Sequence, residues 1–411
     1  MANIVFTASV FRGHLVATKT LVEELKTLGH NVHYYAPAKY QDMLAAMNVS
    51  YNLYPSFNSL ESLISGKLSA TDLHGRLFSL VNGTVNAAFD IIPWLGEEFN
   101  NKKVDLVIYD NMAFWGGIVA NEQSIPSICS TSVMAINSNT IAATKEGSVY
   151  VDNMPDYVTQ PLLNLKAMYK SDVSSLLDLI TGQYSDHVIL YTSKALQRHA
   201  EHFPETKYLF FPKRYDAQSF PLQNEISDSG GLRVFVSFGT LFNNDVDIFK
   251  HIIDAFGALN HNVTISAGAK QEIFNDLDNY NHYPHISVKF FVNQTEVLME
   301  SDIFLTHAGF NGVQEAIYHL VPMITSPVAG DQNFISKTLV DKGVAQLLDR
   351  NSSLEPQLRT IISDIQNRWD EYQINLKAIR DSLTAQETVD VVLAKIEQVI
   401  AGTSELHLDE L

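Results

Sequence analysis

A strand, a glycine-containing turn and a helix follow one another at the start of the chain, and this order restricts the fold more than any other feature. Residues 3–8 form a short β-branched and aromatic run, Arg12-Gly13 interrupts it, and leucines then recur at helical spacing until a second strand at 32–35. The same alternation of strand and helix begins again with a strand at 233–237. Because a strand, a helix and a further strand in succession form a βαβ unit, the sequence predicts an α/β protein with two doubly wound, parallel-sheet domains facing one another.

A change in residue composition separates the two halves of the chain. Between Phe203 and Gly231 the chain gathers proline, asparagine, serine and glycine, which favour neither helix nor strand. We therefore predict a first domain at 1–218, a second at 219–385, and a terminal helix and tail at 386–411. The segments 55–95 and 135–185 have interrupted helical periodicity and few motifs, which is typical of insertions that shape a binding site.

Composition limits the partners of the chain. Its 28 basic and 46 acidic residues give a formal charge of −18, and no local block of Lys or Arg offsets it. We expect no binding to nucleic acid or anionic lipid, so any phosphate must be held by backbone amides and a few placed side chains. The single cysteine, Cys129, suits a reducing compartment, and no segment is long and apolar enough for a signal peptide or a bilayer span. The sequence therefore predicts a cytoplasmic protein.

The second half contains three glycine-rich or polar turns, each directly after an apolar strand. The run 306–312 reads Thr-His-Ala-Gly-Phe-Asn-Gly and opens a helix, a place where backbone amides and the helix dipole favour an anion. A second turn spans 237–240 and a third spans 327–332. Taken singly, glycines before a helix also serve simply to make a tight turn, and Glu315 also fits a capping box. Their occurrence together after parallel strands favours a phosphate site.

The residues of these turns carry a resemblance to a known family. Phe291-Val-Asn-Gln294, then His307-Ala-Gly-Phe-Asn-Gly312 with Glu315, then Pro322 and Asp331-Gln332 resemble the donor-binding signature of family 1 UDP-glycosyltransferases, most nearly the bacterial macrolide-glycosyltransferase branch. The match spans about forty residues in the correct order, and weaker similarity covers nearly the whole chain. It implies the GT-B architecture, with a C-terminal helix that returns to the N-terminal, acceptor-binding domain.

The resemblance assigns a role to each matching residue. In the second, nucleotide-sugar-binding domain, the resemblance implies that Phe291 and Gln294 flank the uracil and that Glu315 accepts hydrogen bonds from the ribose. It implies that Asp331 and Gln332 bind the sugar. The diphosphate would be held by the residues of the two glycine turns, which are His307, Gly309, Asn311, Gly312, Gly239 and Thr240. Two positions depart from the family. Gly312 replaces a serine, which removes a hydroxyl but keeps an amide, and Asn293 replaces a proline, which we expect to loosen the turn before Gln294.

In the first domain, His14 and Asp110 are the candidate catalytic pair. His14 follows Arg12-Gly13 at a helix start, where the positive end of the helix favours a neutral imidazole that can accept a proton. Asp110 ends the strand 104–109, the edge at which open α/β sheets bind ligands. Alone, each also fits a purely structural role, as a helix-start residue and as an N-cap. The resemblance makes the aspartate the partner of a basic histidine, and we expect Phe11, Arg12, Phe114 and Trp115 to line the acceptor site.

These assignments predict an inverting, metal-independent transferase that moves a hexose, with glucose favoured, from a UDP-sugar to a hydroxyl of a small, largely apolar acceptor such as a phenol, flavonoid or macrolide. The UDP-sugar is a co-substrate, and no further cofactor is expected. A UDP-sugar epimerase, a cell-wall or lipid glycosyltransferase of the same fold, and a non-catalytic nucleotide-sugar binder are the alternatives. The sequence leaves open the acceptor, the choice among glucose, galactose and GlcNAc, and the oligomeric state.

Overall fold

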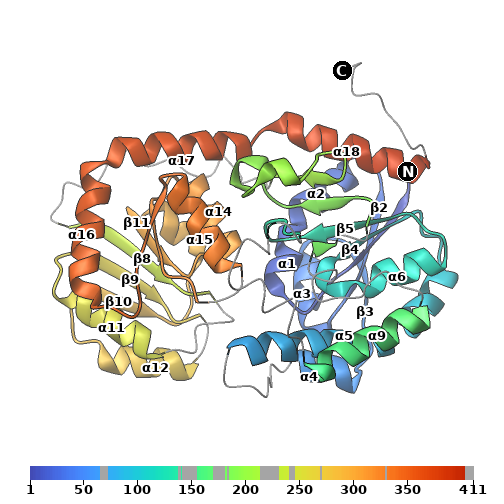
Figure 1. Ribbon diagram of the computed structural model, residues 1–411, viewed down its shortest axis with the longest axis horizontal. Helices are drawn as coiled ribbons and strands as arrows, with labels where there is room; N and C mark the ends of the chain where they lie inside the picture. The colour runs from blue at the N-terminus through green and yellow to red at the C-terminus, as the bar shows by residue number, and fades with distance from the viewer. Residues whose placement is uncertain are drawn as a thin grey trace. The chain divides into compact units, whose positions relative to one another are not determined.

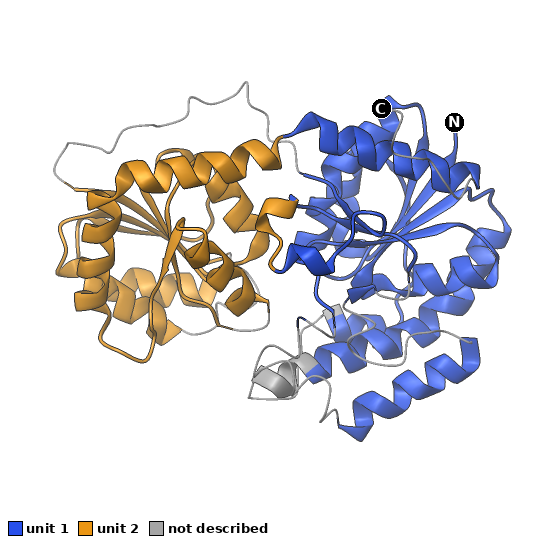
Figure 2. Ribbon diagram, turned by 45° about the horizontal axis from the view of Figure 1, so that its top comes forward, with its two compact units in different colours: residues 1–193, 199–213, 385–411 blue, residues 194–198, 214–384 orange. Residues whose placement is uncertain are grey.

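A computed structural model describes residues 1–64, 73–137, 140, 155–169, 181–182, 185–212, 231–239, 246–268, 271–328 and 331–402 of the chain (Figure 1). The chain forms two compact units (Figure 2). Unit 1 contains residues 1–193, 199–213 and 385–411, and unit 2 contains residues 194–198 and 214–384. The boundary expected between residues 218 and 219 falls in the segment 213–230, which lies outside the described residues.

Unit 1 is built on a parallel sheet that has seven strands in the described part of the chain, in the order β3-β2-β1-β4-β5-β6-β7. Its strands are β1 (Asn3–Thr7), β2 (Asn31–Ala36), β3 (Ser50–Leu53), β4 (Leu106–Asp110), β5 (Ser127–Thr131), β6 (Val188–Leu190) and β7 (Tyr208–Phe210). Strand β1 pairs with β2 on one side and with β4 on the other, where Thr7 lies opposite Tyr109. The residues that follow β1 and β4 therefore meet at one edge of the sheet.

Helices cover both faces of this sheet, which is why its strands are almost continuously apolar. Ile4 and Phe6 of β1 pack into one core cluster, and Val5 between them packs into the other. The unit contains helices α1 (Arg12–Ala17), α2 (Lys19–Thr27), α3 (Gln41–Ala46), α4 (Asn58–Ile64), α5 (Leu73–Asn100), α6 (Trp115–Glu122), α9 (Asp156–Tyr169) and α18 (Gln386–Ala401), with 3₁₀ turns at Ala38–Tyr40, Asn111–Ala113 and Ala200–His202.

The last helix, α18, belongs to unit 1 although it follows unit 2 in the sequence. Val389, Val392 and Ile396 are buried in the core cluster that also contains Ile4 and Phe6. Nε2 of His30, which precedes β2, lies 2.5 Å from the Glu397 carboxylate. Apolar burial and this polar contact together fix α18 on unit 1.

Unit 2 contains a second parallel sheet, with six strands among the described residues in the order β10-β9-β8-β11-β12-β13. The strands are β8 (Arg233–Ser237), β9 (Asn262–Ser266), β10 (Ile286–Lys289), β11 (Ile303–Thr306), β12 (Met323–Thr325) and β13 (Ala345–Leu347). The helices are α11 (Val246–Gly257), α12 (Gln271–Tyr280), α13 (Gln294–Met299), α14 (Phe310–Tyr318), α15 (Gln332–Asp341), α16 (Leu354–Asn367) and α17 (Trp369–Leu383), with a 3₁₀ turn at Lys194–Leu196. The three turns identified in the sequence follow β8, β11 and β12, which are neighbours in this sheet.

The prediction of two doubly wound parallel-sheet domains is confirmed. Of the helices within the described ranges, none combines the length and the apolar character that crossing a bilayer requires.

Candidate active site

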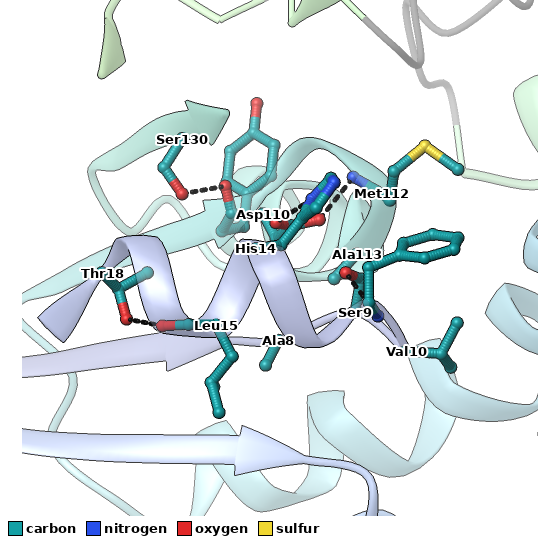
Figure 3. Close-up of polar contacts among 12 residues, drawn as sticks. Ala8, Ser9, Val10, His14, Leu15, Thr18, Asp110, Met112, Ala113 and Ser130 are labelled. Atoms are coloured by element: carbon teal, nitrogen blue, oxygen red, sulfur yellow. Dashed lines mark hydrogen bonds and ion pairs between the residues drawn. The ribbon is translucent and has the colours of Figure 1, made fainter. Parts of the chain in front are cut away.

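His14 and Asp110 are brought together across 96 residues of sequence (Figure 3). His14 lies in α1, directly after the loop that leaves β1, and Asp110 is the last residue of the neighbouring strand β4. Nδ1 of the histidine lies 2.7 Å from Oδ2 of the aspartate. The two side chains are 17% and 9% exposed, so the pair is largely screened from solvent while the histidine stays reachable.

The second oxygen of Asp110 is also held. Oδ1 accepts a hydrogen bond from the backbone N–H of Met112 at 2.8 Å, so the carboxylate caps the short 3₁₀ turn as well as contacting His14. With one oxygen fixed by the turn, the other is aimed at the imidazole. Nδ1–H of His14 donates to that oxygen, which makes Nε2 the acceptor nitrogen of the neutral ring. This tautomer is the one that a general base needs.

Two tyrosines fix the loop that leads into α1, and sequence reasoning missed both. The hydroxyl of Tyr40 donates to the carbonyl of Val10, and the hydroxyl of Tyr54 donates to the carbonyl of Ala8 at 3.2 Å. The sequence carries no signal for these contacts, because the tyrosines come from separate segments that only the folded sheet brings to the loop.

The aromatic residues around the pair divide into two groups. Phe11 lies with its ring centroid 5.3 Å from that of His14, and Arg12 beside it is exposed. Phe114 and Trp115 are fully buried in the core, where the indole N–H of Trp115 donates to the Tyr54 hydroxyl at 3.0 Å. The expectation that Phe114 and Trp115 line the acceptor site is therefore wrong, because neither presents surface to a ligand.

A small cavity of about 10 Å³ borders the pair, and Thr18, Tyr34 and Ser130 line it together with His14 and Asp110. A volume of this size holds about one water molecule, so it is no substrate pocket. Thr18 and Tyr34 are already bonded to each other, with their hydroxyl oxygens 2.6 Å apart. This cavity therefore has no room for an acceptor molecule.

In unit 2 the imidazole of His307 is enclosed by two glycines. His307 follows β11, Gly239 follows β8 in the left-handed region (φ +69°), and Gly309 precedes α14. A Cβ at Gly309 would lie 2.5 Å from Nε2 of His307, and one at Gly239 would lie 2.8 Å from Cε1. Atoms this close clash, so both positions must be glycine for the ring to sit here. Thr240, predicted beside Gly239, lies outside the described residues.

Burial keeps His307 neutral. Desolvation lowers the pKa of His307 to about 4, and the nearby Arg350 charge lowers it in the same direction, against the effect of a hydrogen bond to the Ser237 backbone. At neutral pH this side chain carries no charge, so it can interact with an anion only as a hydrogen-bond donor. Any positive charge at the carboxyl edge of the second sheet must therefore come from other groups.

Two buried histidines, His307 before α14 and His319 after it, predict a loss of stability in mild acid. Burial lowers the pKa of each to about 4, below the value near 6.5 of an unfolded histidine. Between these values the unfolded chain binds more protons, so stability falls as the pH drops from about 6.5 towards 4. We expect His319→Gln to recover about 1–2 kcal/mol of the unfolding free energy that the parent loses between pH 7 and pH 5, measured by urea unfolding. Parallel pH profiles for the two proteins would contradict this.

The start of α14 meets the start of α13. The Gln294 side-chain amide donates to Glu315 Oε2 at 2.7 Å, and a Cβ at Gly312 would lie 3.0 Å from the nitrogen of that amide. Glycine at 312 thus leaves room for the Gln294–Glu315 contact, which gives the departure from serine a local reason. Phe291 precedes this contact and is 66% exposed, which leaves a ring face open for stacking.

Asn293, the second departure from the family pattern, does not change the shape of its turn. Its φ of −73° is the value that a proline ring imposes, and its side-chain amide donates to Glu296 at 2.8 Å. The expectation that asparagine loosens the turn is therefore wrong for the backbone conformation.

Comparisons with known proteins agree with this arrangement. A family model described as "UDP-glucoronosyl and UDP-glucosyl transferase" matches residues 216–390, which include all three turns of unit 2. Over 97% of this chain and 98% of its own length, the uncharacterized UDP-glucosyltransferase YojK of Bacillus subtilis (strain 168) is 26% identical. The oleandomycin glycosyltransferase of Streptomyces antibioticus is 24% identical over 87% of this chain and 82% of its own.

Residues 216–390 thus match a glycosyltransferase family, and relatives named as glycosyltransferases extend the similarity over nearly the whole chain. The fold agrees: the crystal structure of the glycotransferase of kitacinnamycin superposes with a TM-score of 0.79 at 21% identity, covering 97% of this chain and 98% of that one. The GT-B architecture predicted from the sequence is thus confirmed.

The third turn of unit 2 has one exposed and one buried candidate residue. Asp331 is exposed, whereas Gln332 is buried and its side-chain oxygen accepts the backbone N–H of Val328 at 2.8 Å. Gln332 therefore ties the start of α15 to Val328, a role that the sequence did not predict. Sugar binding by Asp331 and Gln332 stays a prediction.

Proposed function

We propose that this glycosyltransferase moves a hexose, with glucose the leading candidate, from a UDP-sugar to a hydroxyl of a small, largely apolar acceptor, with inversion at the anomeric carbon. The observation that carries the proposal is the 2.7 Å contact between His14 and Asp110 at the carboxyl edge of the first sheet. A histidine whose Nδ1–H is bound by a carboxylate has the form of a general base, and a non-catalytic binder has no use for one.

In the proposed reaction, Nε2 of His14 takes the proton of the acceptor hydroxyl as its oxygen attacks the anomeric carbon of the sugar. The bond between that carbon and the diphosphate oxygen breaks, and UDP leaves with the electron pair. The proton stays on His14 as an imidazolium, which the Asp110 carboxylate stabilises. Because the new bond forms opposite the one that breaks, the anomeric configuration inverts.

The donor is proposed to bind at the carboxyl edge of the sheet in unit 2. Phe291 would stack on the uracil, Glu315 would accept the ribose hydroxyls, and the diphosphate would lie at the start of α14. Support comes from the exposed Phe291 ring, the Glu315 carboxylate beside Gln294, and the glycines that let the backbone approach an anion. The leaving diphosphate would be stabilised by these donors.

The scheme uses no metal ion, so we propose that transfer continues in the presence of a chelator. We also propose a cytoplasmic location, which suits the single, buried and unpaired cysteine, Cys129.

Replacing Asp110 with asparagine is expected to lower kcat by about 10²–10⁴-fold while the dissociation constant for UDP stays within about twofold. An asparagine whose oxygen keeps the Met112 N–H would turn its NH₂ towards Nδ1 of His14. Nδ1 would then become the acceptor and Nε2 would carry the hydrogen, so the ring could not take a proton. Steady-state kinetics and calorimetric UDP titration measure the two quantities. An Asp110→Asn enzyme with full kcat would remove Asp110 from the mechanism.

The alternatives are separated by product analysis. Incubation with UDP-GlcNAc alone, followed by sugar analysis, detects an epimerase. A donor-by-acceptor screen read by mass spectrometry detects transfer and compares UDP-glucose with UDP-galactose, UDP-GlcNAc and dTDP-sugars. A membrane-lipid acceptor finds no support in the charge of −18, because anionic lipid surfaces repel such a chain.

A further inference from the structure

Arg350 is a cation at the carboxyl edge of the second sheet that no sequence motif singles out. It follows β13 and is half-buried. Its Nε donates to the Ser326 hydroxyl at 2.8 Å, and an Nη donates to the Ser326 carbonyl at 2.5 Å. The guanidinium carbon lies 4.8 Å from the centroid of the Phe238 ring. One side chain thus contacts the first residue after β12 and the first residue after β8.

These two contact points lie on either side of β11, the strand that leads to His307. Strand β11 pairs with β8 and with β12, and the Ser326 N–H donates to the Thr306 carbonyl at the end of β11. The Arg350 side chain therefore spans three neighbouring strand ends. A planar guanidinium that both stacks and donates two hydrogen bonds fixes its partners more rigidly than an ammonium group does.

Each contact point begins one of the proposed donor turns. Phe238 precedes Gly239, whose backbone lies against His307. Ser326 begins residues 326–328, and the backbone N–H of Val328 donates to the side-chain oxygen of Gln332 at the start of α15. The position of Arg350 thus sets how residues 326–328, which precede the proposed sugar-binding residues, lie relative to Gly239 of the proposed diphosphate site.

The charge of Arg350 acts at the same place. Its positive charge reaches the imidazole of His307 and disfavours protonation there. His307 is neutral, so a diphosphate at the start of α14 would meet the guanidinium as a full positive charge in a partly buried setting, where screening by salt is weaker than on the surface.

We propose that Arg350 is a positioning residue for the nucleotide sugar: it fixes residues 326–328 against residues 237–239 and supplies positive charge to the diphosphate edge. The inference rests on the proposed function, since it takes a nucleoside diphosphate sugar as the ligand. It goes further by naming the residue that joins the two turns.

The test compares Arg350→Met, which removes both the positive charge and the planar guanidinium group, with Arg350→Lys, which keeps the charge but not the guanidinium. Arg368→Met is the matched control, because Arg368 also stacks on an aromatic ring, that of Tyr372, but does so at the junction of α16 and α17. Calorimetry with uridine, UMP and UDP, and kinetics with UDP-glucose, are measured for each protein.

We expect Arg350→Met to weaken UDP binding by about tenfold or more, the effect of losing charge-assisted contacts, with uridine binding unchanged within about twofold. Arg350→Lys is expected to restore most of the UDP affinity but to keep a raised KM for UDP-glucose, since an ammonium cannot hold Ser326 and stack on Phe238 together. Arg368→Met is expected to bind all ligands as the parent does.

Three results would overturn the inference: UDP binding unchanged in Arg350→Met, uridine and UDP weakened to the same degree, or full rescue of the KM by lysine. The first would leave Arg350 a role in folding alone. If Arg350→Met does not fold, Arg350→Lys decides, because an unchanged KM for UDP-glucose in that variant contradicts the positioning role. A parent protein that fails to bind UDP at all would instead refute the proposed function.

Discussion

Replacing His14 with glutamine is expected to lower transfer to an alcohol by about 10³-fold and to leave the dissociation constant for UDP within about twofold. Glutamine keeps a group that can donate to Asp110, so the local fold is retained, but it cannot accept a proton at neutral pH. The proposed donor site lies in unit 2, whereas His14 lies in unit 1. Catalysis and nucleotide binding should therefore separate cleanly. Product formation by chromatography and UDP titration by calorimetry measure both.

His251→Gln is the control for this experiment, because His251 is exposed on α11 and contacts neither proposed site. It is expected to retain full activity. A His14→Gln enzyme that transfers at the parental rate would show that His14 is not the base. If that variant lost UDP binding as well, the proposed division of roles between the units would be wrong.

The second large effect is expected from the smallest substitution, Gly309→Ala. The backbone at Gly309 has ordinary angles for any residue (φ −66°, ψ 129°), so an alanine meets no backbone strain. Its Cβ would lie 2.5 Å from Nε2 and 2.6 Å from Cε1 of His307, an edge of the ring that Gly239 also approaches. The imidazole must leave its position. We expect UDP affinity to fall by about 10–100-fold. The variant would lose a hydrogen bond from His307 to the charged diphosphate, and the start of α14 would be displaced.

Gly96→Ala provides the matched control. A Cβ at Gly96 would meet only the Gln123 side chain, at an ordinary 3.8 Å. This variant is expected to bind UDP normally and to be slightly more stable, because alanine favours a helix. Unchanged UDP affinity in Gly309→Ala, measured by the same calorimetry, would show that the diphosphate does not depend on the His307 position.

The fold was largely predictable because both sheets are covered on two faces, which makes their strands apolar runs ended by glycine turns. The strands missed in the sequence are short or carry little pattern, such as β6 and β7 with three residues each and the half-exposed β3. Segments of this length have no measurable periodicity. They become strands because neighbouring strands already present hydrogen-bonding edges.

The candidate site was predictable where a general rule of α/β sheets applied. The sheet rule placed Asp110 at a ligand-binding edge, the family resemblance paired it with His14, and the structure places the two side chains 2.7 Å apart. Phe114 and Trp115 follow Asp110 in sequence, but nothing in the sequence shows that the turn after β4 directs them into the core. Arg350 was missed because its partners, Ser326 and Phe238, are 24 and 112 residues away and form no motif.

Product analysis of the parent enzyme tests the central claim most directly. UDP-glucose is incubated with phenolic, flavonoid and macrolide acceptors, and UDP release is followed alongside mass spectrometry and NMR of the products. We predict acceptor-dependent UDP release matched by an equal amount of hexosylated acceptor with an inverted, β-configured linkage. Binding of UDP-glucose with no UDP release above the acceptor-free rate across the whole panel would contradict the account and identify a nucleotide-sugar binder.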